Sequence, residues 1–306
     1  MDIVLATLLT IITAATPLLF AAIGEMVTEK SGVLNLGVEG MILLGAVTGF
    51  AVVHYSDSAS LGIFAGMLAG AGLSLVFAAL VLGFQASQVA TGLALTIFGI
   101  GFSALLGQNL VGVAYDGLPK LPIPGLSQIP FLGPLLFQHD ILVYLSVVLV
   151  ILVSWFLYKT RYGLILRAVG DSHDAAHAIG YPVIWVRLCA TLFGGAMAGL
   201  AGAYLSLAYS PLWIENMSAG RGWIALALVV FATWRPWRVM VGAYLFGGIT
   251  ILQLHAQAMG IGLPSQIMSM LPYLATIFVL VLISRDRNKI RLNAPASIGK
   301  PFHPTT

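Results

Sequence analysis

The stretch "GEMVTEKSGVLNLGVEG", residues 24–40, lies between two almost purely apolar runs and carries four charged side chains: Glu25, Glu29, Lys30 and Glu39. The run before it, residues 3–24, is long enough to cross a bilayer as a helix, which takes about 20 residues. The run after it, residues 40–56, is shorter. We expect residues 25–30 to form a solvated turn at the membrane surface. We expect residues 31–40 to begin a second helix that is broken and loosened by glycine.

The composition indicates a chain that is dissolved in lipid. Of the 306 residues, 59% are hydrophobic and 8% are charged, whereas soluble domains carry about 25% charged residues. The single cysteine, Cys189, excludes an internal disulfide and a multi-cysteine metal site. His173 and His177 are one helical turn apart, but no third ligand is near them in sequence, so we expect no metal site. The net charge of +3 does not indicate a nucleic-acid partner, because the basic residues cluster at the ends of apolar runs. We therefore predict an all-α polytopic membrane protein.

Apolar runs predict about nine membrane-spanning helices, with a range of eight to ten, in one domain of residues 1–284. Residues 58–115 have no formal charge and would make a helix of about 87 Å, so they must fold as two spans. Residues 116–139 are rich in proline and glycine, which break helices, and we expect them to form a loop. The other expected spans cover residues 141–158 and 188–214, with two more in residues 239–284. Residues 222–234 form a short seventh span that is not long enough to cross unaided. The tail, residues 285–306, is basic and polar, and we expect it to fray.

Lysine and arginine residues predict the orientation of the chain, because they favour the cytoplasmic side of a membrane. They form three groups, which are Lys159, Arg161, Arg167 and Arg187, then Arg235 and Arg238, then Arg285, Arg287, Lys289 and Arg291. Alternating spans allow all three groups to be cytoplasmic. This arrangement places the C-terminus and the loop of residues 161–182 in the cytoplasm. It places the N-terminus and residues 116–139 outside the cytoplasm.

Two stretches of the chain are alike: "SGVLNLGVEGMILLGAVTGF" from Ser31 and "SAGRGWIALALVVFATW" from Ser218. Each follows a long apolar run, and each begins with polar and glycine residues before a shorter apolar run. The predicted topology places them on opposite sides of the membrane, as an inverted repeat of spans 1–4 and 6–9 with broken helices would. The alternative is a coincidence between two glycine-rich loops.

Glycine recurs every four residues in two of the expected spans. The positions are Gly62, Gly66 and Gly70 in one span and Gly195 and Gly199 in another. Small residues at this spacing let helix backbones approach closely, so the pattern predicts a tightly packed bundle.

The longest polar stretch between two spans is "KTRYGLILRAVGDSHDAAHAIGYPV", residues 159–183. Asp171 or Ser172 can cap a helix that runs through "SHDAAHAI" and ends at Gly180, just before Pro182. Such a short amphipathic helix is either an interfacial connector or a contact site for a partner.

The segment "DAAHAIG", residues 174–180, has the spacing of the EAA-x-x-x-G motif through which ABC-importer permeases contact their ATPase, with Asp174 in place of the usual glutamate. The loop "YGLILRAVGDSHDAAHAIGY" resembles that of the branched-chain amino acid, ribose and nucleoside permease family. "GEMVTEKSGVLNLGVEGMILLGA" resembles the nucleoside and simple-sugar branch, and "SAGRGWIALALVVFATWRPW" followed by "GAYLFGG" is similar to its second half. The resemblance covers about residues 15–284. It departs from the family at His177, where a basic residue, usually arginine, is common, and at the bulky "TWRPWR".

The resemblance implies that the chain is the transmembrane permease subunit of an ABC importer in the bacterial inner (cytoplasmic) membrane, and that it carries nucleosides or similar small polar solutes. The implied partners are a second homologous permease, two ATP-binding subunits, an extracytoplasmic substrate-binding lipoprotein and the lipid bilayer. The sequence has no G-x-x-x-x-G-K-[ST] phosphate loop. We therefore expect no enzymatic activity, no catalytic residue and no cofactor in this chain, with ATP bound by a partner subunit. The alternatives are the same machinery carrying simple sugars and a self-sufficient secondary transporter.

Two sets of residues are candidates for function. The ATPase-coupling set, implied by the resemblance, is Arg167, Asp171, Asp174, Ala175, Ala176, His177 and Gly180. The substrate-pathway set is Asn35, Glu39, Gln85, Asn109 and Arg221. Polar side chains within a membrane are unfavourable and often functional, and Asn and Gln both donate and accept hydrogen bonds, which suits the hydroxyls and base edges of a nucleoside. Glu39 and Arg221 occupy comparable places in the two similar stretches. The alternative is that these residues join neighbouring helices.

Overall fold

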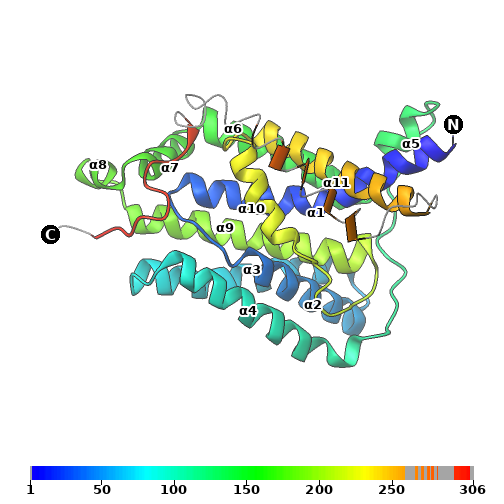
Figure 1. Ribbon diagram of the computed structural model, residues 1–306, viewed down its shortest axis with the longest axis horizontal. Coiled ribbons are helices and arrows are strands. Elements are labelled where there is room, and N and C mark those ends of the chain that lie inside the picture. Colours follow the sequence, from blue (N-terminus) through cyan, green and yellow to red (C-terminus); the bar gives the residue numbers. More distant parts are fainter. Residues whose placement is uncertain are drawn as a thin grey trace.

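The protein is a bundle of helices that run mostly along the long axis of the molecule (Figure 1). The computed structural model describes residues 2–258 and 293–303, together with scattered residues between 266 and 281. The helices are α1 (Asp2–Lys30), α2 (Val38–Ser56), α3 (Ala59–Ala78), α4 (Gln88–Gly107), α5 (Leu132–Phe137), α6 (Ile141–Lys159), α7 (Arg161–Asp171), α8 (His173–Ala178), α9 (Val183–Tyr204), α10 (Arg221–Phe231) and α11 (Pro236–Ala258). A π-helical turn extends α3 over Ala79–Gly83 and another extends α9 over Leu205–Tyr209.

Seven helices in the described part of the chain are long and apolar enough to cross a membrane, namely α1, α2, α3, α4, α6, α9 and α11. The apolar α10, with 11 residues, is too short to cross alone, as expected for residues 222–234. The second span expected within residues 239–284 lies largely outside the described residues, as do Arg285, Arg287, Lys289 and Arg291. The observed helices confirm an all-α, multi-pass membrane protein, and their number agrees with an expectation of about nine.

The centre of the bundle is α9, which packs against α1, α2 and α3. The glycines predicted to allow close packing lie at these contacts. A Cβ atom on Gly70 would overlap the carbonyl oxygen of Gly195, and one on Gly199 would overlap the carbonyl oxygen of Gly66. Because the backbones themselves touch, dispersion contacts extend along the whole crossing of α3 and α9. The prediction of a tightly packed bundle is confirmed.

The two ends of the bundle differ. Figure 1 shows α8 and the C-terminal residues at one end, and the N-terminus and α5 at the other. We call these the α8 end and the α5 end. Residues 111–131, at the α5 end, are non-helical, as their prolines and glycines predict. The expected loop of residues 116–139 differs in its last part, where Leu132–Phe137 form the short helix α5. This loop is tied to the chain that follows α9, because Tyr115 N donates to Pro211 O at 3.0 Å.

The charged residues 25–30 are not the solvated turn that we expected. The helix α1 continues through Lys30, and Glu25 and Glu29 are each only 1% exposed. Each of these two carboxylates accepts a hydrogen bond from another part of the chain. Glu25 Oε1 accepts a hydrogen bond from Asn35 N at 3.1 Å, and Glu29 Oε2 accepts one from Trp234 Nε1 at 2.6 Å. The prediction was wrong because these polar contacts replace the water that a surface turn would supply.

The expectation that the tail frays is also wrong for residues 293–303. This segment crosses the α8 end of the bundle and is bonded to it at several points. Ser297 N donates to Gly170 O at 2.9 Å, and Gly299 N donates to Gly32 O at 3.1 Å. The backbone of the tail therefore finds its hydrogen-bond partners in α7 and in the segment after α1.

Candidate functional site

The second span begins with a break, as predicted. Residues 31–37 are non-helical and form a lead-in segment between α1 and α2. Gly32 has a φ of +89°, which favours glycine. Asn35 Oδ1 accepts a hydrogen bond from Gly37 N at 2.9 Å, which forms a local turn before α2 starts at Val38. Leu34 N donates to Gln88 Oε1 at 2.7 Å, so the lead-in segment is fastened to the start of α4.

Glu39, in the first turn of α2, binds the start of α10 directly. Its Oε1 accepts hydrogen bonds from Ser218 Oγ at 2.5 Å and Gly220 N at 2.8 Å, and its Oε2 accepts one from Gly222 N at 2.6 Å. The side chain is buried, with 3% exposure. A carboxylate in this position satisfies free N–H groups of α10 and lies at the positive ends of two helix dipoles. We call these four residues the Glu39 clasp.

The Glu39 clasp lies inside the bundle. Gly40, the next residue, packs against the backbone of Leu95 and Thr96 in α4. Leu95 is about 10 Å along α4 from its first residue, Gln88, at 1.5 Å per residue. The two similar stretches of sequence therefore meet each other within the bundle. The stretch from Ser31 enters from the α8 end, where Gly299 N donates to Gly32 O, and the chain before Ser218 comes from the α5 end, where Tyr115 N donates to Pro211 O. The meeting point is where the two helices start, which is the arrangement of paired broken helices.

The other substrate-pathway candidates divide into two groups. Asn35 is fully buried in the lead-in segment, and Arg221 begins α10 beside the clasp. The Arg221 guanidinium donates to Ser218 O at 3.1 Å and lies 5.2 Å from the ring centre of Tyr209. Gln85 and Asn109 are exposed before the start and after the end of α4. The structure thus gathers Asn35, Glu39 and Arg221 in one region and separates Gln85 and Asn109 from them.

The ATPase-coupling candidates lie around α8, which projects from the bundle (Figure 1). Ser172 Oγ accepts a hydrogen bond from Ala175 N at 3.3 Å, so Ser172 rather than Asp171 caps the helix. Gly180 has a φ of +91° and ends the turn that follows α8. Asp174, Ala175 and Gly180 are exposed.

Three of the remaining coupling candidates, Ala176, His177 and Arg167, contact the bundle or its tail through their side chains. Ala176 is buried, with 2% exposure, and the His177 ring lies 5.3 Å from the ring of Phe302, edge to face. The Arg167 guanidinium lies 5.2 Å from the ring centre of Tyr158. The Asp171 side chain is exposed, while its carbonyl oxygen accepts a hydrogen bond from Ser297 Oγ at 3.3 Å.

The structural role of Arg187 was not predicted from the sequence. There, Arg187 was only one of the basic residues that indicate the orientation of the chain. Arg187 is buried, with 1% exposure, in the second turn of α9. Its Nε donates to Ser31 O at 3.2 Å, one terminal nitrogen donates to Lys300 O at 3.1 Å, and the other donates to His173 Nδ1 at 3.1 Å. Burial lowers the pKa of His173, and the Arg187 charge lowers it further. A single arginine inside an apolar run was the available signal.

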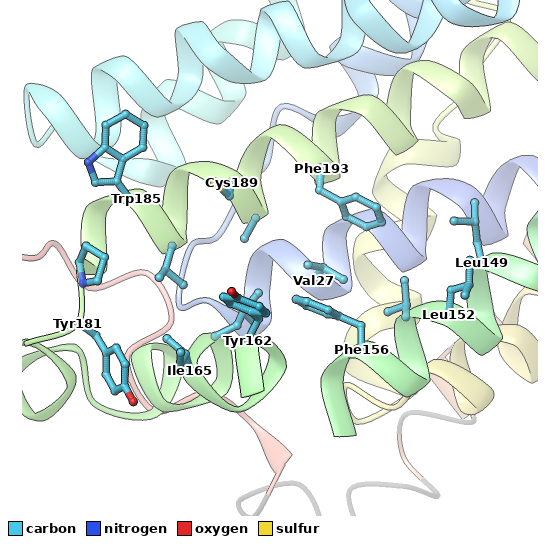
Figure 2. A pocket seen from close by; sticks show the side chains of 15 residues that line it. Val27, Leu149, Leu152, Phe156, Tyr162, Ile165, Tyr181, Trp185, Cys189 and Phe193 are labelled. Atoms are coloured by element: carbon cyan, nitrogen blue, oxygen red, sulfur yellow. The ribbon is translucent and has the colours of Figure 1, made fainter. Parts of the chain in front are cut away.

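An apolar groove of about 620 Å³ lies between α6 and α9, beside α7. Figure 2 shows side chains such as Phe156, Tyr162, Trp185 and Phe193 around it. The groove lacks the convergent polar groups that orient a hydroxyl-rich solute in a binding site. It is therefore suited to apolar groups rather than to a nucleoside or sugar. Among the residues that the structure describes, no cluster of three His, Cys, Asp or Glu side chains could hold a metal.

Comparison with known proteins identifies the family. Residues 7–282 match the family described as "Branched-chain amino acid transport system / permease component". The chain is 40% identical to the "Putative glucose ABC transporter permease protein TsgC13" of Haloferax volcanii, over 95% of each chain. It is 32% identical to the "Guanosine ABC transporter permease protein NupQ" of Bacillus subtilis, over 94% of this chain and 93% of the relative. It is 33% identical to the "Nucleoside ABC transporter permease protein NupC" of Lactococcus lactis, over 88% and 89%. No solved structure matches the chain. The chain therefore belongs to the branched-chain amino acid transport system permease component family, as a multi-pass membrane permease.

Proposed function

We propose that this chain is the permease subunit of an ABC importer that moves nucleosides or similar small polar solutes into the cell. The observation that carries the proposal is α8, a short helix that projects from one end of a membrane-spanning bundle. Its exposed residues include Asp174, Ala175 and Gly180. A projecting helix with small residues and a sharp exit suits a socket on a separate protein. The three relatives described above, each named as an ABC transporter permease protein, support this assignment.

The proposed assembly contains a second homologous permease, two ATP-binding subunits and an extracytoplasmic substrate-binding lipoprotein. This chain would neither bind nor hydrolyse ATP, because its sequence lacks the phosphate-binding loop of P-loop ATPases. Closure of the two ATP-binding subunits would pull on α8, and the attached helices would follow. A self-sufficient secondary transporter works without an ATPase, so it does not require a projecting helix that contacts one.

We place the α8 end of the bundle in the cytoplasm and the chain in the cytoplasmic membrane of the cell. Tyr158 of α6 lines the same hollow as Arg235 and Arg238, so the basic groups around α6 and α11 share one end. Basic residues favour the cytoplasmic side. The C-terminal residues would then be cytoplasmic, residues 161–182 would be the coupling loop, and residues 116–139 would be extracytoplasmic.

An uncharged cargo agrees with the Glu39 clasp. In transporters with broken helices, free helix N-termini often bind the carboxylate of an anionic substrate. In this chain the start of α10 is already occupied by the Glu39 carboxylate. A neutral, hydroxyl-rich solute such as a nucleoside needs no such anion site. Simple sugars are the second candidate, and the relative named for glucose, at 40% identity, favours them.

Uptake measurements test the proposal. Cells that lack this chain should lose uptake of labelled inosine, and labelled ribose should be followed in parallel. Unchanged inosine uptake with lost ribose uptake would replace the nucleoside assignment with the sugar assignment. Transport by the purified chain alone, driven by an ion gradient in liposomes, would overturn the importer assignment.

A substitution at Gly180 tests the role of α8. Gly180→Val strains a backbone with φ +91° and should displace the exit of α8. We expect ATP hydrolysis by the assembled importer to continue while uptake per ATP falls. Gly180→Asn should retain coupling, since asparagine tolerates the left-handed region. Normal uptake in the valine variant would refute the role of α8.

A further inference from the structure

The α8 end contains a buried arginine that joins three separate segments. Arg187 of α9 donates to Ser31 O in the lead-in segment, to Lys300 O in the tail and to His173 Nδ1 in α8. No other side chain in the described structure is bonded to all three of these segments. A buried guanidinium requires such acceptors, because its charge is otherwise unfavourable away from water.

The tail lies across this arginine and against α8. Phe302 is buried, with 8% exposure, and belongs to a small apolar cluster with Val169, Ala176 and Val183. Its ring meets the His173 ring at 5.4 Å and the His177 ring at 5.3 Å, both edge to face. Edge-to-face contacts of this kind fix the relative orientation of the rings.

The tail is also fastened to the bundle at three residues that precede Phe302. Ser297 N donates to Gly170 O at the end of α7, and Gly299 N donates to Gly32 O in the lead-in segment. Nearer the start of the segment, Lys30 Nζ donates to Asn293 O at 2.6 Å. The tail therefore holds α8 against the same segment that leads to the Glu39 clasp.

We propose that residues 295–303 form a strap that positions α8, and that Arg187 ties the strap and α8 to the lead-in segment. The strap and Arg187 are positioning elements that act through α8, so this inference rests on the proposed coupling function. A helix of six residues has little stability of its own and takes its orientation from its contacts. The strap provides the apolar contact that α8 needs on its inner face. Because Arg187 is bonded to both His173 and Ser31, a movement of α8 is transmitted to the lead-in segment. The lead-in segment continues into α2, which carries Glu39.

Crosslinking tests the geometry without any partner protein. In a Cys189→Ser background, Ala178→Cys and His303→Cys place thiols next to the contact between His177 and Phe302. A short bifunctional thiol reagent should join them within one chain reconstituted in lipid nanodiscs. The control is Tyr55→Cys with His303→Cys, because Tyr55 ends α2 at the opposite end of the bundle. Equal yields from the two pairs would overturn the strap.

Transport measurements on the assembled importer test the positioning role. Phe302→Ala should lower uptake per ATP hydrolysed by about tenfold, which corresponds to about 1.4 kcal/mol, with basal ATP hydrolysis retained. Phe302→Tyr should restore coupling because it keeps the ring. Lys300→Ala is the matched control, since the side chain is exposed and Arg187 uses only the Lys300 carbonyl.

The outcomes separate the strap from the proposed function. If Gly180→Val uncouples the importer and Phe302→Ala does not, the strap is refuted and the role of α8 stands. If neither variant changes uptake per ATP, the proposed coupling function fails as well. If Phe302→Ala only reduces the amount of assembled importer, with normal uptake per complex, the strap supports folding alone and the proposal is refuted.

Discussion

Glu39 connects the two halves of the molecule through one carboxylate. Three donors converge on it, and two of them are backbone N–H groups at the start of α10. Glu39→Gln keeps the shape of the side chain but turns one acceptor into a donor, which would face an N–H group. We expect the free energy of unfolding to fall by about 2 kcal/mol, the usual effect of an unsatisfied buried polar group. Thermal unfolding of the purified chain in detergent measures this change.

The matched control for this prediction is Glu215→Gln. Glu215 carries the same side chain and lies in the loop before α10, but it is exposed. Its substitution should change stability by less than about 0.5 kcal/mol, as is usual at the surface. Equal effects of the two substitutions would show that the hydrogen bonds of Glu39 contribute no more to the free energy of unfolding than an exposed side chain does.

Single residues also mark what the sequence could and could not predict. Asn35 and Glu39 stood out because polar groups are rare in a chain with 8% charged residues. The same rarity did not show that Glu25 and Glu29 are buried, because a charge beside an apolar run is usually solvated. Their partners, Asn35 N and Trp234 Nε1, are 10 and 205 residues away. Only the fold brings the second of these pairs together.

At the level of elements, α8 and the tail form a unit whose stability should depend on pH. Burial and the charge of Arg187 lower the pKa of His173. The charges of Lys300 and His303 lower it as well, whereas the charge of Asp174 raises it. When α8 is displaced, His173 regains its ordinary pKa of about 6.5. The displaced state therefore binds more protons below about pH 6.5, so the packed state is fully stable above this pH and loses stability as the pH falls.

The crosslink between positions 178 and 303 measures this dependence. Its yield should be constant above about pH 7 and should fall on acidification below about pH 6.5. Yields should be compared after quenching at one common pH, because thiol reactivity itself varies with pH. In a His173→Gln background the fall should be much smaller. A yield that rises on acidification would contradict the sign of the effect.

Elements also differ in how far their sequences determine them. The spans α3, α4 and α6 were predicted well because the bilayer sets the length of an apolar helix. The helix α8 was predicted from its cap, Ser172, and its glycine exit, Gly180, which are local signals. The strap could not be predicted in this way. Residues 293–303 look like a polar tail, and their order depends on contacts of Phe302 with a helix more than 120 residues earlier.

At the scale of the whole molecule, the crossing of α3 and α9 is one of the contacts that form the centre of the bundle. The helices α3 and α9 approach until backbone meets backbone, and the glycines at the crossing have no room for a side chain. Sequence spacing predicted the close approach but not its partner, because every-fourth-residue glycines in one span fit several neighbours. The partner is set by the rest of the fold, in which α9 lies between α1, α2 and α3.

The crossing makes a prediction about the stability of the bundle. A Cβ atom in Gly199→Ala would overlap the carbonyl oxygen of Gly66 and lie 3.0 Å from Gly70 N, so the helices must separate. We expect a loss of about 1–3 kcal/mol in unfolding free energy from overpacking. Gly101→Ala in α4 is the matched control, because no atom lies within 4 Å of the added Cβ. This second change should stabilise the chain by up to about 1 kcal/mol through helix propensity. Reversible unfolding of both variants in one detergent gives the comparison. Equal or reversed effects would mean that the contact between α3 and α9 is looser than the glycine packing requires.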